Sequence, residues 1–307
     1  MYCYRSLRVF ILSSGSSGNV IVLEAPCGAR LVVDAGVNPT AAAGRMRALG
    51  TDLFPSGALG IIITHHHGDH IAHAQPLARA LGRSVQGTMA LGARASNAAP
   101  RSAPVFMHAG ISAARLREKL EVRGYVASKG GGESSAPHAP FDVGPFTIEA
   151  LAVPHDAPQV ALRITAAGKT FGLATDLGHV PHALTEFLAD CDLALLESNH
   201  CPRMLDEGPY PMRLKQRVRG PLGHLANEQC AALAARLVGS RLAKLLLGHV
   251  SLRNNTPARA LDVVASRCPG LAVEVVPNGA PRLFDIESAL RGRRPTQLAL
   301  PFAAMAS

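Results

Sequence analysis

Four histidines and an aspartate fall within six residues of the chain, directly after an apolar segment. The segment 60–64 contains three isoleucines and predicts a buried strand, and His65, His67, Asp69 and His70 follow it. Because His65 and His67 are two residues apart, an extended backbone points both side chains the same way. Asp69 and His70 follow where we expect the chain to turn into a helix, so they present a second set of donors. Imidazole and carboxylate donors suit Zn²⁺, Mn²⁺ or Fe²⁺.

Three further donors stand at the ends of expected strands downstream of this cluster. They are His155, Asp176 and His249, which follow the strand-like segments 147–153, 170–174 and 244–247. A single histidine is more often a core or surface residue than a ligand, and an exposed histidine cluster is the plain alternative for residues 65–70. Three donors in this order argue against coincidence, so the sequence predicts a metal site.

Short strands must position these donors, because apolar segments of strand length recur through the chain. Glycine, proline or aspartate usually marks the end of each segment. The expected strands are 8–12, 20–24, 30–34, 60–64, 104–107, 147–153, 161–165, 170–174, 193–197, 244–248 and 273–276. The expected helices are 38–49, 71–81, 113–122, 182–188, 227–238 and 257–266, with Asn227 as a candidate N-cap. This order predicts mixed sheets covered by helices.

Composition excludes several classes of protein. With 307 residues, of which 48% are hydrophobic and 17% charged, the chain can bury the core of one large domain or two small ones and is not a disordered polymer. No apolar segment approaches the roughly 20 residues of a membrane helix, and the one after Arg8 is too short for a signal peptide. The six cysteines form no CxxC pair, which is typical of free thiols in a reducing compartment. We therefore expect a cytoplasmic protein with no membrane partner.

The net charge of +9 is compatible with a polyanionic partner such as DNA. The alternative is the arginine-rich usage of a GC-rich genome, and charge alone leaves both open. The basic segment 203–219 carries five lysines and arginines, Arg217 among them. It either lines the path of an acidic substrate or forms an ordinary solvated face.

The order and spacing of the donors resemble the metallo-β-lactamase superfamily over residues 5–285. The resemblance implies an α/β fold, a four-layer αββα sandwich, with a two-metal site at one edge of its sheets. In the family pattern, the first ion would be held by His65, His67 and His155, the second by Asp69, His70 and His249, and Asp176 would bridge them. The cofactors implied are two divalent ions per chain, Zn²⁺ or Mn²⁺, with Fe²⁺ as a further candidate.

A narrower set of motifs is similar to the YycJ/WalJ branch of that superfamily. The matching segments are 12–19, 154–157, 175–178, 197–200, 208–211, 214–217, 223–227 and 251–255. The chain departs from the branch at His66, where glutamate is common, and at Cys201, where the branch often has aspartate. Neither position matches a metal ligand, so the expected metal chemistry is unchanged. The resemblance implies a 5′-exonuclease of double-stranded DNA.

The same resemblance assigns catalytic roles beyond metal binding. His224 would bind the scissile phosphate or protonate the leaving oxygen, with Glu197 orienting it and Asp69 as a further catalytic residue. An ordinary salt bridge is the alternative for Glu197.

The segment 13–19 is a Gly/Ser loop between two expected strands. Its backbone N–H groups, with Ser14, Ser16, Ser17 and Asn19, would bind substrate by cradling a phosphate. A tight turn without a ligand is the alternative.

The C-terminal segment 291–307 departs from the pattern of the rest, so we expect a catalytic domain over residues 1–290 and a flexible tail. Gln297, Leu298, Leu300 and Phe302 resemble the short peptide by which bacterial DNA-processing proteins dock on the sliding clamp. Leucine and phenylalanine anchors on an extended segment suit groove recognition. The alternative is a tail that folds back on the domain.

These expectations combine into a two-metal phosphodiesterase that hydrolyses DNA, a 5′-to-3′ exonuclease of repair or replication. A metallo-hydrolase of a small ester, thioester or lactam would use the same metals, and an RNA phosphodiesterase would share the site. A recruitment module that only docks on the clamp is a further alternative, against which the complete donor set argues.

Overall fold

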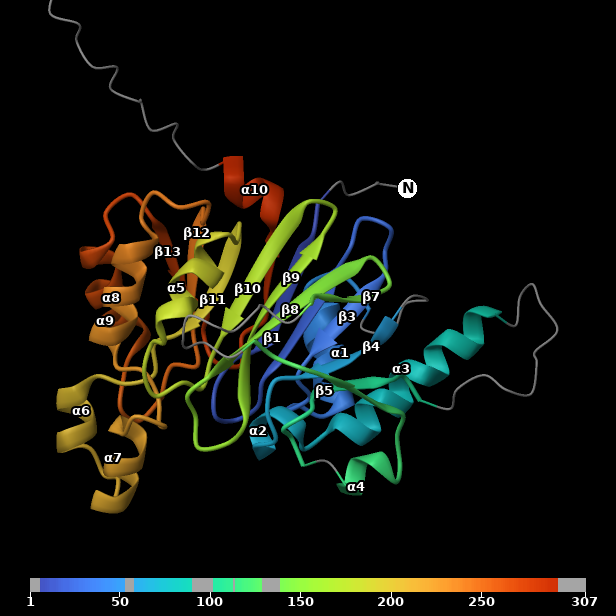
Figure 1. Cartoon of the computed structure of the whole chain (residues 1–307), viewed down its shortest axis with the longest axis horizontal. Helices are drawn as coiled ribbons and strands as arrows, with labels where there is room; N and C mark the ends of the chain where they lie inside the picture. Colours follow the sequence, from blue (N-terminus) through green and yellow to red (C-terminus); the bar gives the residue numbers. More distant parts are fainter. Residues whose placement is uncertain (1–5, 53–57, 90–101, 113, 129–138, 292–307) are drawn as a thin grey trace, which may run out of the picture.

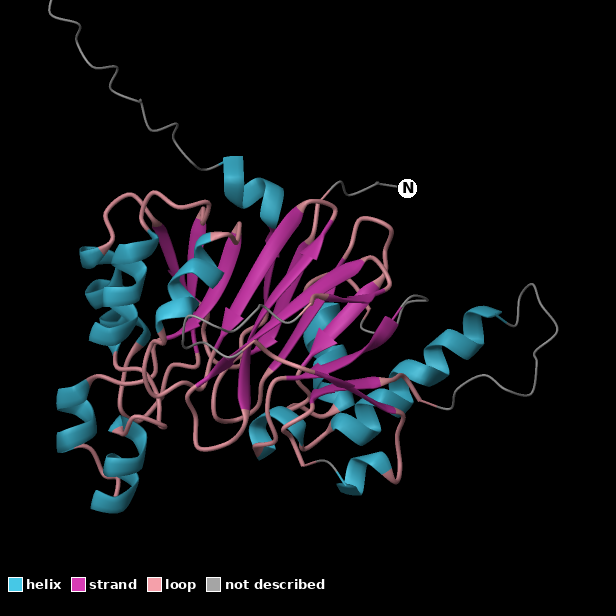
Figure 2. Cartoon of the chain, in the orientation of Figure 1, coloured by secondary structure: helices cyan, strands magenta, loops and turns pink. Residues whose placement is uncertain are grey.

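The computed structural model describes residues 6–52, 58–89, 102–112, 114–128 and 139–291, and within these ranges the strands form two mixed sheets of seven strands each (Figures 1 and 2). Helices flank the sheets on their outer sides. This is the expected four-layer αββα sandwich. The clamp-like segment 297–302 lies outside the described residues, as does most of 128–139.

The first sheet is antiparallel on one side and parallel on the other. In spatial order its strands are β14 (Arg282–Asp285), β1 (Arg8–Ser13), β2 (Val20–Glu24), β3 (Arg30–Val33), β4 (Ala58–Ile63), β5 (Val105–His108) and β6 (Val122–Tyr125). Neighbours from β14 to β3 run antiparallel, and those from β3 to β6 run parallel. The β1–β2 register pairs Val9 with Leu23 and shifts between Ile11 and Ser13, just before the loop 14–19.

The second sheet repeats this plan. In spatial order its strands are β13 (Ala272–Val275), β12 (Lys244–Gly248), β11 (Leu193–Glu197), β10 (Lys169–Ala174), β9 (Gln159–Ala166), β8 (Phe146–Val153) and β7 (Phe141–Val143). Neighbours from β7 to β10 run antiparallel, and those from β10 to β13 run parallel. The carboxyl ends of β8, β10, β11 and β12 therefore meet at one edge, where open α/β sheets place ligands.

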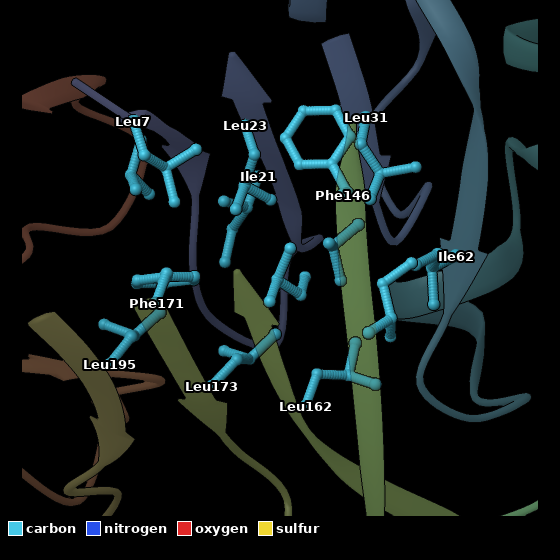
Figure 3. Packing of buried hydrophobic residues seen from close by; sticks show 14 of the residues in the cluster. Leu7, Ile21, Leu23, Leu31, Ile62, Phe146, Leu162, Phe171, Leu173 and Leu195 are labelled. Carbon is cyan, nitrogen blue, oxygen red and sulfur yellow. The ribbon is translucent and has the colours of Figure 1, made fainter. Parts of the chain in front are cut away.

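Both faces of the central strands are buried, which explains their continuous apolar sequences. In β1, Val9 and Ile11 pack in the cluster between the sheets, whereas Phe10 and Leu12 pack in the cluster under the helices. β11 alternates in the same way between two clusters. Figure 3 shows side chains of the two sheets meeting between them.

Helices close the two outer faces. α1 (Pro39–Ala48) and α3 (Ala74–Met89) cover the first sheet, and α5 (His182–Ala189), α8 (Asn227–Leu237) and α9 (Pro257–Arg267) cover the second. The shorter helices are α2 (Gly68–Ile71), α4 (Ala114–Arg117), α6 (Pro202–Glu207), α7 (Met212–Arg219) and α10 (Ile286–Arg291). Figure 1 shows α6 and α7 below α8 and α9, beyond the helices that cover the sheet. None of the helices in the described ranges has the length and apolar character needed to cross a membrane.

The expected strands agree with the structure to within a residue or two, but some other local predictions are wrong. The expected helix 113–122 is not one helix, because α4 ends at Arg117 and Val122 begins β6, which pairs with β5. The N-cap of α8 is Ala226 rather than Asn227, whose side chain bonds to Ser198 and Asn255 instead. The sequence pattern does not predict the strands β6, β7 and β14 or the helices α6, α7 and α10, since each is short and lacks a regular apolar pattern.

Candidate metal centre

The histidine-rich segment connects β4 to α2 at the edge of the first sheet. β4 ends at Ile63, His67 is the N-cap of α2, and Asp69 and His70 lie in its single turn. His65 and His70 are buried, whereas His67 is half-buried and His66 is exposed. The strand and the helix therefore aim two separate sets of donors inward from one short segment.

The first set of donors is histidine only. His65, His67 and His155 each offer a ring nitrogen, and these atoms lie within 4.8 Å of one another. Nε2 of His155 is 3.3 Å from Nδ1 of His67. His155 reaches this point from the loop after β8, so the two sheets contribute to the group together.

The second set combines two carboxylates with two imidazoles. Asp69, His70, Asp176 and His249 offer atoms within 4.8 Å of one another. The two oxygens of Asp176 divide between the rings, with Oδ2 3.2 Å from Nε2 of His70 and Oδ1 3.4 Å from Nε2 of His249. Asp69 Oδ2 is 3.6 Å from each of these nitrogens. All seven expected metal ligands thus lie in two adjacent groups.

Several donor atoms in these groups make no hydrogen bond in the described part of the chain, although other donors of the second group stand 3.2 and 3.4 Å from two of them. Nε2 of His65, Oδ2 of Asp176 and Nε2 of His249 are buried without a hydrogen bond. A buried polar atom without a partner is costly and rare, and nitrogen and carboxylate oxygen are the ligands that a divalent ion takes. The donor set therefore fits a pair of metal ions.

The backbone is also strained at the site. Asp34, Asp176 and His249 adopt positive φ angles of 61°, 58° and 50°. Such a conformation is uncommon for residues other than glycine and costs about 1–3 kcal/mol each, and it persists where the surroundings require it. Here it turns side chains inward from the ends of β3, β10 and β12.

Each histidine of the two groups has a partner for its other ring nitrogen. These contacts are His70 Nδ1 to Asp34 Oδ2 at 2.7 Å, His249 Nδ1 to Glu197 Oε2 at 2.8 Å, His155 Nδ1 to Gly223 O at 3.1 Å, His65 Nδ1 to Thr64 Oγ1 at 3.3 Å, and His67 Nε2 to Asp156 Oδ1 at 3.5 Å. Metal-ligating histidines usually have such partners, which fix the ring and its tautomer. Residue type and spacing do not single out Asp34, Thr64 or Asp156. The only signals in the sequence were an aspartate closing a strand and one next to His155.

Charge in the second group favours a bound cation. In the neighbouring first group, burial and the nearby His70 lower the pKa of His65, so that ring is neutral and able to act as a ligand. Burial alone would lower the pKa of His70, but the carboxylates of Asp34 and Asp176 raise it to about 10. Although burial alone would raise it, His249 and His70 hold the pKa of Asp176 well below its usual value. In the second group His70 therefore keeps a proton, and a bound metal ion would take the place of that positive charge.

Glu197 and His224 meet behind the second group. Glu197 is fully buried, and its Oε2 lies 2.9 Å from Nδ1 of His224 and 2.8 Å from Nδ1 of His249. Its other oxygen accepts the N–H of Leu225 at 2.8 Å. Burial would raise the pKa of Glu197, but His224 and His249 lower it to about 2. Burial alone would lower the pKa of His224, but the charge of Glu197 and its hydrogen bond to the ring raise it.

The Gly/Ser loop contacts the site mainly through its ends. Ser14 is buried and its hydroxyl accepts the N–H of His249 at 3.0 Å. Asn19 donates its own N–H to the carbonyl oxygen of Asp69 at 2.7 Å, and its Nδ2 lies 2.8 Å from Nε2 of His70. Both side chains are thus engaged with the metal-binding segments, whereas Ser16 and Ser17 are exposed.

The basic segment 203–219 forms α6 and α7, and much of its charge is paired within it. Lys215 donates to the carbonyl oxygen of Asp206 at 2.5 Å, and Arg219 forms an ion pair with the Asp206 carboxylate. Arg217 instead reaches toward the metal centre, where its Nε donates to Asp156 Oδ2 at 2.6 Å. Cys201, the other departure from the branch pattern, is the buried N-cap of α6.

Comparison with known proteins agrees with this geometry. Residues 29–249 match the family model described as the Beta-lactamase superfamily domain. The chain is 33% identical over 253 residues to Exodeoxyribonuclease WalJ of Streptococcus pneumoniae serotype 2, a match covering 80% of this chain and 82% of that protein. It is 26% identical over 250 residues to Exodeoxyribonuclease YycJ of Bacillus anthracis, covering 81% and 84%. The crystal structure of the metallo-β-lactamase fold protein YhfI from Bacillus subtilis has the same fold, with a TM-score of 0.62, 18% identity, and coverage of 91% of this chain and 100% of that chain.

Proposed function

This chain belongs to the metallo-β-lactamase superfamily, in the branch of the YycJ and WalJ exodeoxyribonucleases, and we propose that it is a two-metal exonuclease that degrades DNA from 5′ ends. The observation that carries the proposal is the pair of adjacent donor groups, in which several buried donor atoms make no hydrogen bond within the described residues. A protein that only recruits partners does not need this site, whose strained backbone and buried polar atoms both cost stability.

The ligands are assigned to two ions. His65, His67 and His155 would hold the first ion, and Asp69, His70 and His249 the second, with Asp176 between them. Zn²⁺ and Mn²⁺ both suit these donors, and Fe²⁺ remains a candidate. When bound, the ions would supply activated water and neutralise charge on the phosphoryl oxygens.

Proton transfer falls to His224. Glu197 accepts from its Nδ1, which leaves Nε2 to face a substrate. Glu197 raises the pKa of this ring and so favours its protonated form, in which Nε2–H can donate to the scissile phosphate or to the leaving oxygen. Glu197 positions this ring and that of His249 together, which couples the acid to the metal centre. Asp69 would contribute to catalysis as a ligand of the second metal ion.

Substrate phosphates would contact the exposed margin of the site. Ser16 and Ser17 offer hydroxyls on the Gly/Ser loop, and Arg217 offers a guanidinium on α7. Ser14 and Asn19 would act indirectly, by holding the segments that carry His249, Asp69 and His70. The net charge of +9 would steer DNA toward the protein, so affinity should fall steeply with salt.

The wider organisation is proposed from sequence. We assign residues 1–290 to the catalytic domain and 291–307 to a tail that docks on the sliding clamp. A reducing compartment such as the cytoplasm suits the five cysteines that are free thiols in the described residues. A role in DNA repair or replication follows from the substrate and from the clamp.

The test is degradation of DNA duplex and single strand, labelled at either the 5′ or the 3′ end, with Mn²⁺ or Zn²⁺. Wild-type protein should release the 5′ label first as a short product, and Asp69→Ala/His70→Ala should lose this activity. RNA of the same sequence and a small ester serve as comparison substrates. Intact DNA in the presence of metal-loaded protein would overturn the proposal, and turnover of the ester or the RNA would then identify the alternative.

A further inference from the structure

Asp156 connects the first donor group to helix α7. Its Oδ1 lies 3.2 Å from Nε2 of His155 and 3.5 Å from Nε2 of His67, while its Oδ2 accepts the 2.6 Å hydrogen bond from Nε of Arg217. The side chains of Asp156 and Arg217 are 30% and 50% exposed, whereas that of His155 is 1% exposed. Asp156 therefore stands where the buried group opens to solvent.

The orientation of His67 makes this carboxylate its partner. Nδ1 of His67 is the atom that faces Nε2 of His155, at 3.3 Å, so Nε2 is the His67 nitrogen left for another partner, and Asp156 Oδ1 lies 3.5 Å from it. An imidazole that binds a metal through one nitrogen is held by an acceptor at the other. The corresponding carboxylates of His70 and His249, Asp34 and Glu197, are buried. His67 alone among these three rings depends on an exposed carboxylate.

Arg217 has N–H groups available for a further ligand in this arrangement. Within the described residues the Arg217 side chain donates one hydrogen bond, from Nε, which leaves the four N–H groups of Nη1 and Nη2. A guanidinium presents such groups as a planar fork that matches a phosphate. Its neighbours Lys215 and Arg219 donate to Asp206 on α6, whereas Arg217 donates to the carboxylate next to His155.

We propose that Asp156 positions His67 in the first metal site and at the same time fixes Arg217 beside it, so that Arg217 binds a phosphate of the nucleic acid. One carboxylate thus sets both the ligand geometry and the place of a substrate contact. The Arg217 half rests on the proposed function, whereas the His67 half requires only that the site binds metal.

Metal affinity tests the His67 half. Metal-stripped protein is titrated with Zn²⁺ against a chromophoric chelator, for wild type and Asp156→Asn. The matched control is Asp206→Asn, an exposed carboxylate that pairs with another arginine of α7. Asp156→Asn should weaken one of the two sites by about tenfold and leave the other unchanged, and Asp206→Asn should weaken neither. Equal affinities for the two variants would overturn this half.

Binding of a 5′-phosphorylated oligonucleotide to metal-stripped protein tests the Arg217 half without turnover. Arg217→Ala should bind about tenfold more weakly than wild type, as expected for a lost charged hydrogen bond, and Arg219→Ala should bind nearly as well as wild type. Arg217→Lys should fall between, because it keeps the charge but loses the fork. If Arg217→Ala and Arg219→Ala bind alike, Arg217 is not the contact.

A double-mutant cycle tests whether one carboxylate does both. Arg217→Ala should cost less oligonucleotide affinity in the Asp156→Asn background than in wild type, because the guanidinium is then no longer fixed. Additive losses would overturn the link. DNA degradation by the wild-type protein is measured in parallel. If the DNA stays intact while Asp156→Asn still lowers the affinity for Zn²⁺, the exonuclease proposal fails but the positioning role of Asp156 holds.

Discussion

Asp34 accepts a 2.7 Å hydrogen bond from Nδ1 of His70, although the two residues are 36 positions apart in the chain. The Asp34 carboxylate also accepts from the N–H and the hydroxyl of Thr64, at 2.9 and 3.0 Å. Asp34 adopts a φ of 61° to reach both. One strained residue at the end of β3 therefore fixes the beginning of the histidine-rich segment and one of its rings.

Replacing Asp34 should affect metal binding more than folding if the shape is kept. Asn tolerates the positive φ and retains an oxygen for Thr64, but it removes the anionic partner of His70. We expect Asp34→Asn to lower the affinity of one metal site by about tenfold, measured by chelator competition. Asp34→Ala should in addition lower the thermal midpoint, because the buried N–H of Thr64 loses its acceptor. Unchanged Zn²⁺ affinity in Asp34→Asn would show that His70 needs no carboxylate.

Loss of His224 should slow the reaction without emptying the metal site. His224→Ala removes a proposed proton donor, which contributes about 10²–10⁴-fold to rate, while His249 keeps its bond to Glu197. We expect kcat to fall by about 10²-fold or more, with KM little changed and two metal ions still bound by elemental analysis. His179→Ala is the matched control, because His179 is exposed and bonds only to a backbone oxygen in the described residues. Wild-type kcat in His224→Ala would refute the acid role.

His200 should make the fold sensitive to mild acid. Burial lowers its pKa to about 4 despite the opposing charge of Glu197, and its Nδ1 has no hydrogen-bond partner within the described chain. On lowering the pH, His200 is therefore protonated near pH 6.5 in the unfolded chain but only near pH 4 in the folded protein. Stability from this residue is complete above pH 6.5 and is lost as pH falls from there to about 4, by roughly 3 kcal/mol at most.

Urea unfolding at pH 7 and pH 5 checks this expectation. Metal-stripped protein is used, so that release of ions does not contribute to the difference. His200→Gln should lose less stability than wild type between the two pH values, and the exposed His179→Gln should behave like wild type. Equal pH dependence in all three proteins would contradict a buried, neutral His200.

The tail should bind the clamp and be dispensable for hydrolysis. Truncation after Arg291 removes Gln297, Leu298, Leu300 and Phe302 but keeps α10, whose Ile286 and Leu290 pack on the core. We expect this variant to degrade short DNA at the wild-type rate and to lose binding to purified sliding clamp in a surface-binding assay. Leu300→Ala/Phe302→Ala in the full chain should give the same result. Clamp binding that survives truncation would refute docking through the tail.

The sequence alone determined the donors and the strands that carry them. His65, His67, Asp69 and His70 are adjacent, and His155, Asp176 and His249 each close an apolar segment, so residue type and spacing suffice to find them. The continuous apolar segments likewise predicted the sheets, because strands buried on both faces leave that pattern. The family resemblance then supplied the order of the layers and the partnership of Glu197 with His224.

Only the tertiary structure decided what stands behind and beside those donors. Asp34 and Asp156 carry no periodic signal, and their importance comes from contacts between segments that are distant in the chain or on different elements. The same holds for Ser14, whose hydroxyl accepts the N–H of His249, 235 positions away in the chain. Hydrogen bonds of this kind depend on how two sheets close on each other, which local sequence does not encode. The charge of α7 was visible in the sequence, but the pairing that sets Arg217 apart from Arg219 arises only once α6, α7 and the loop after β8 meet.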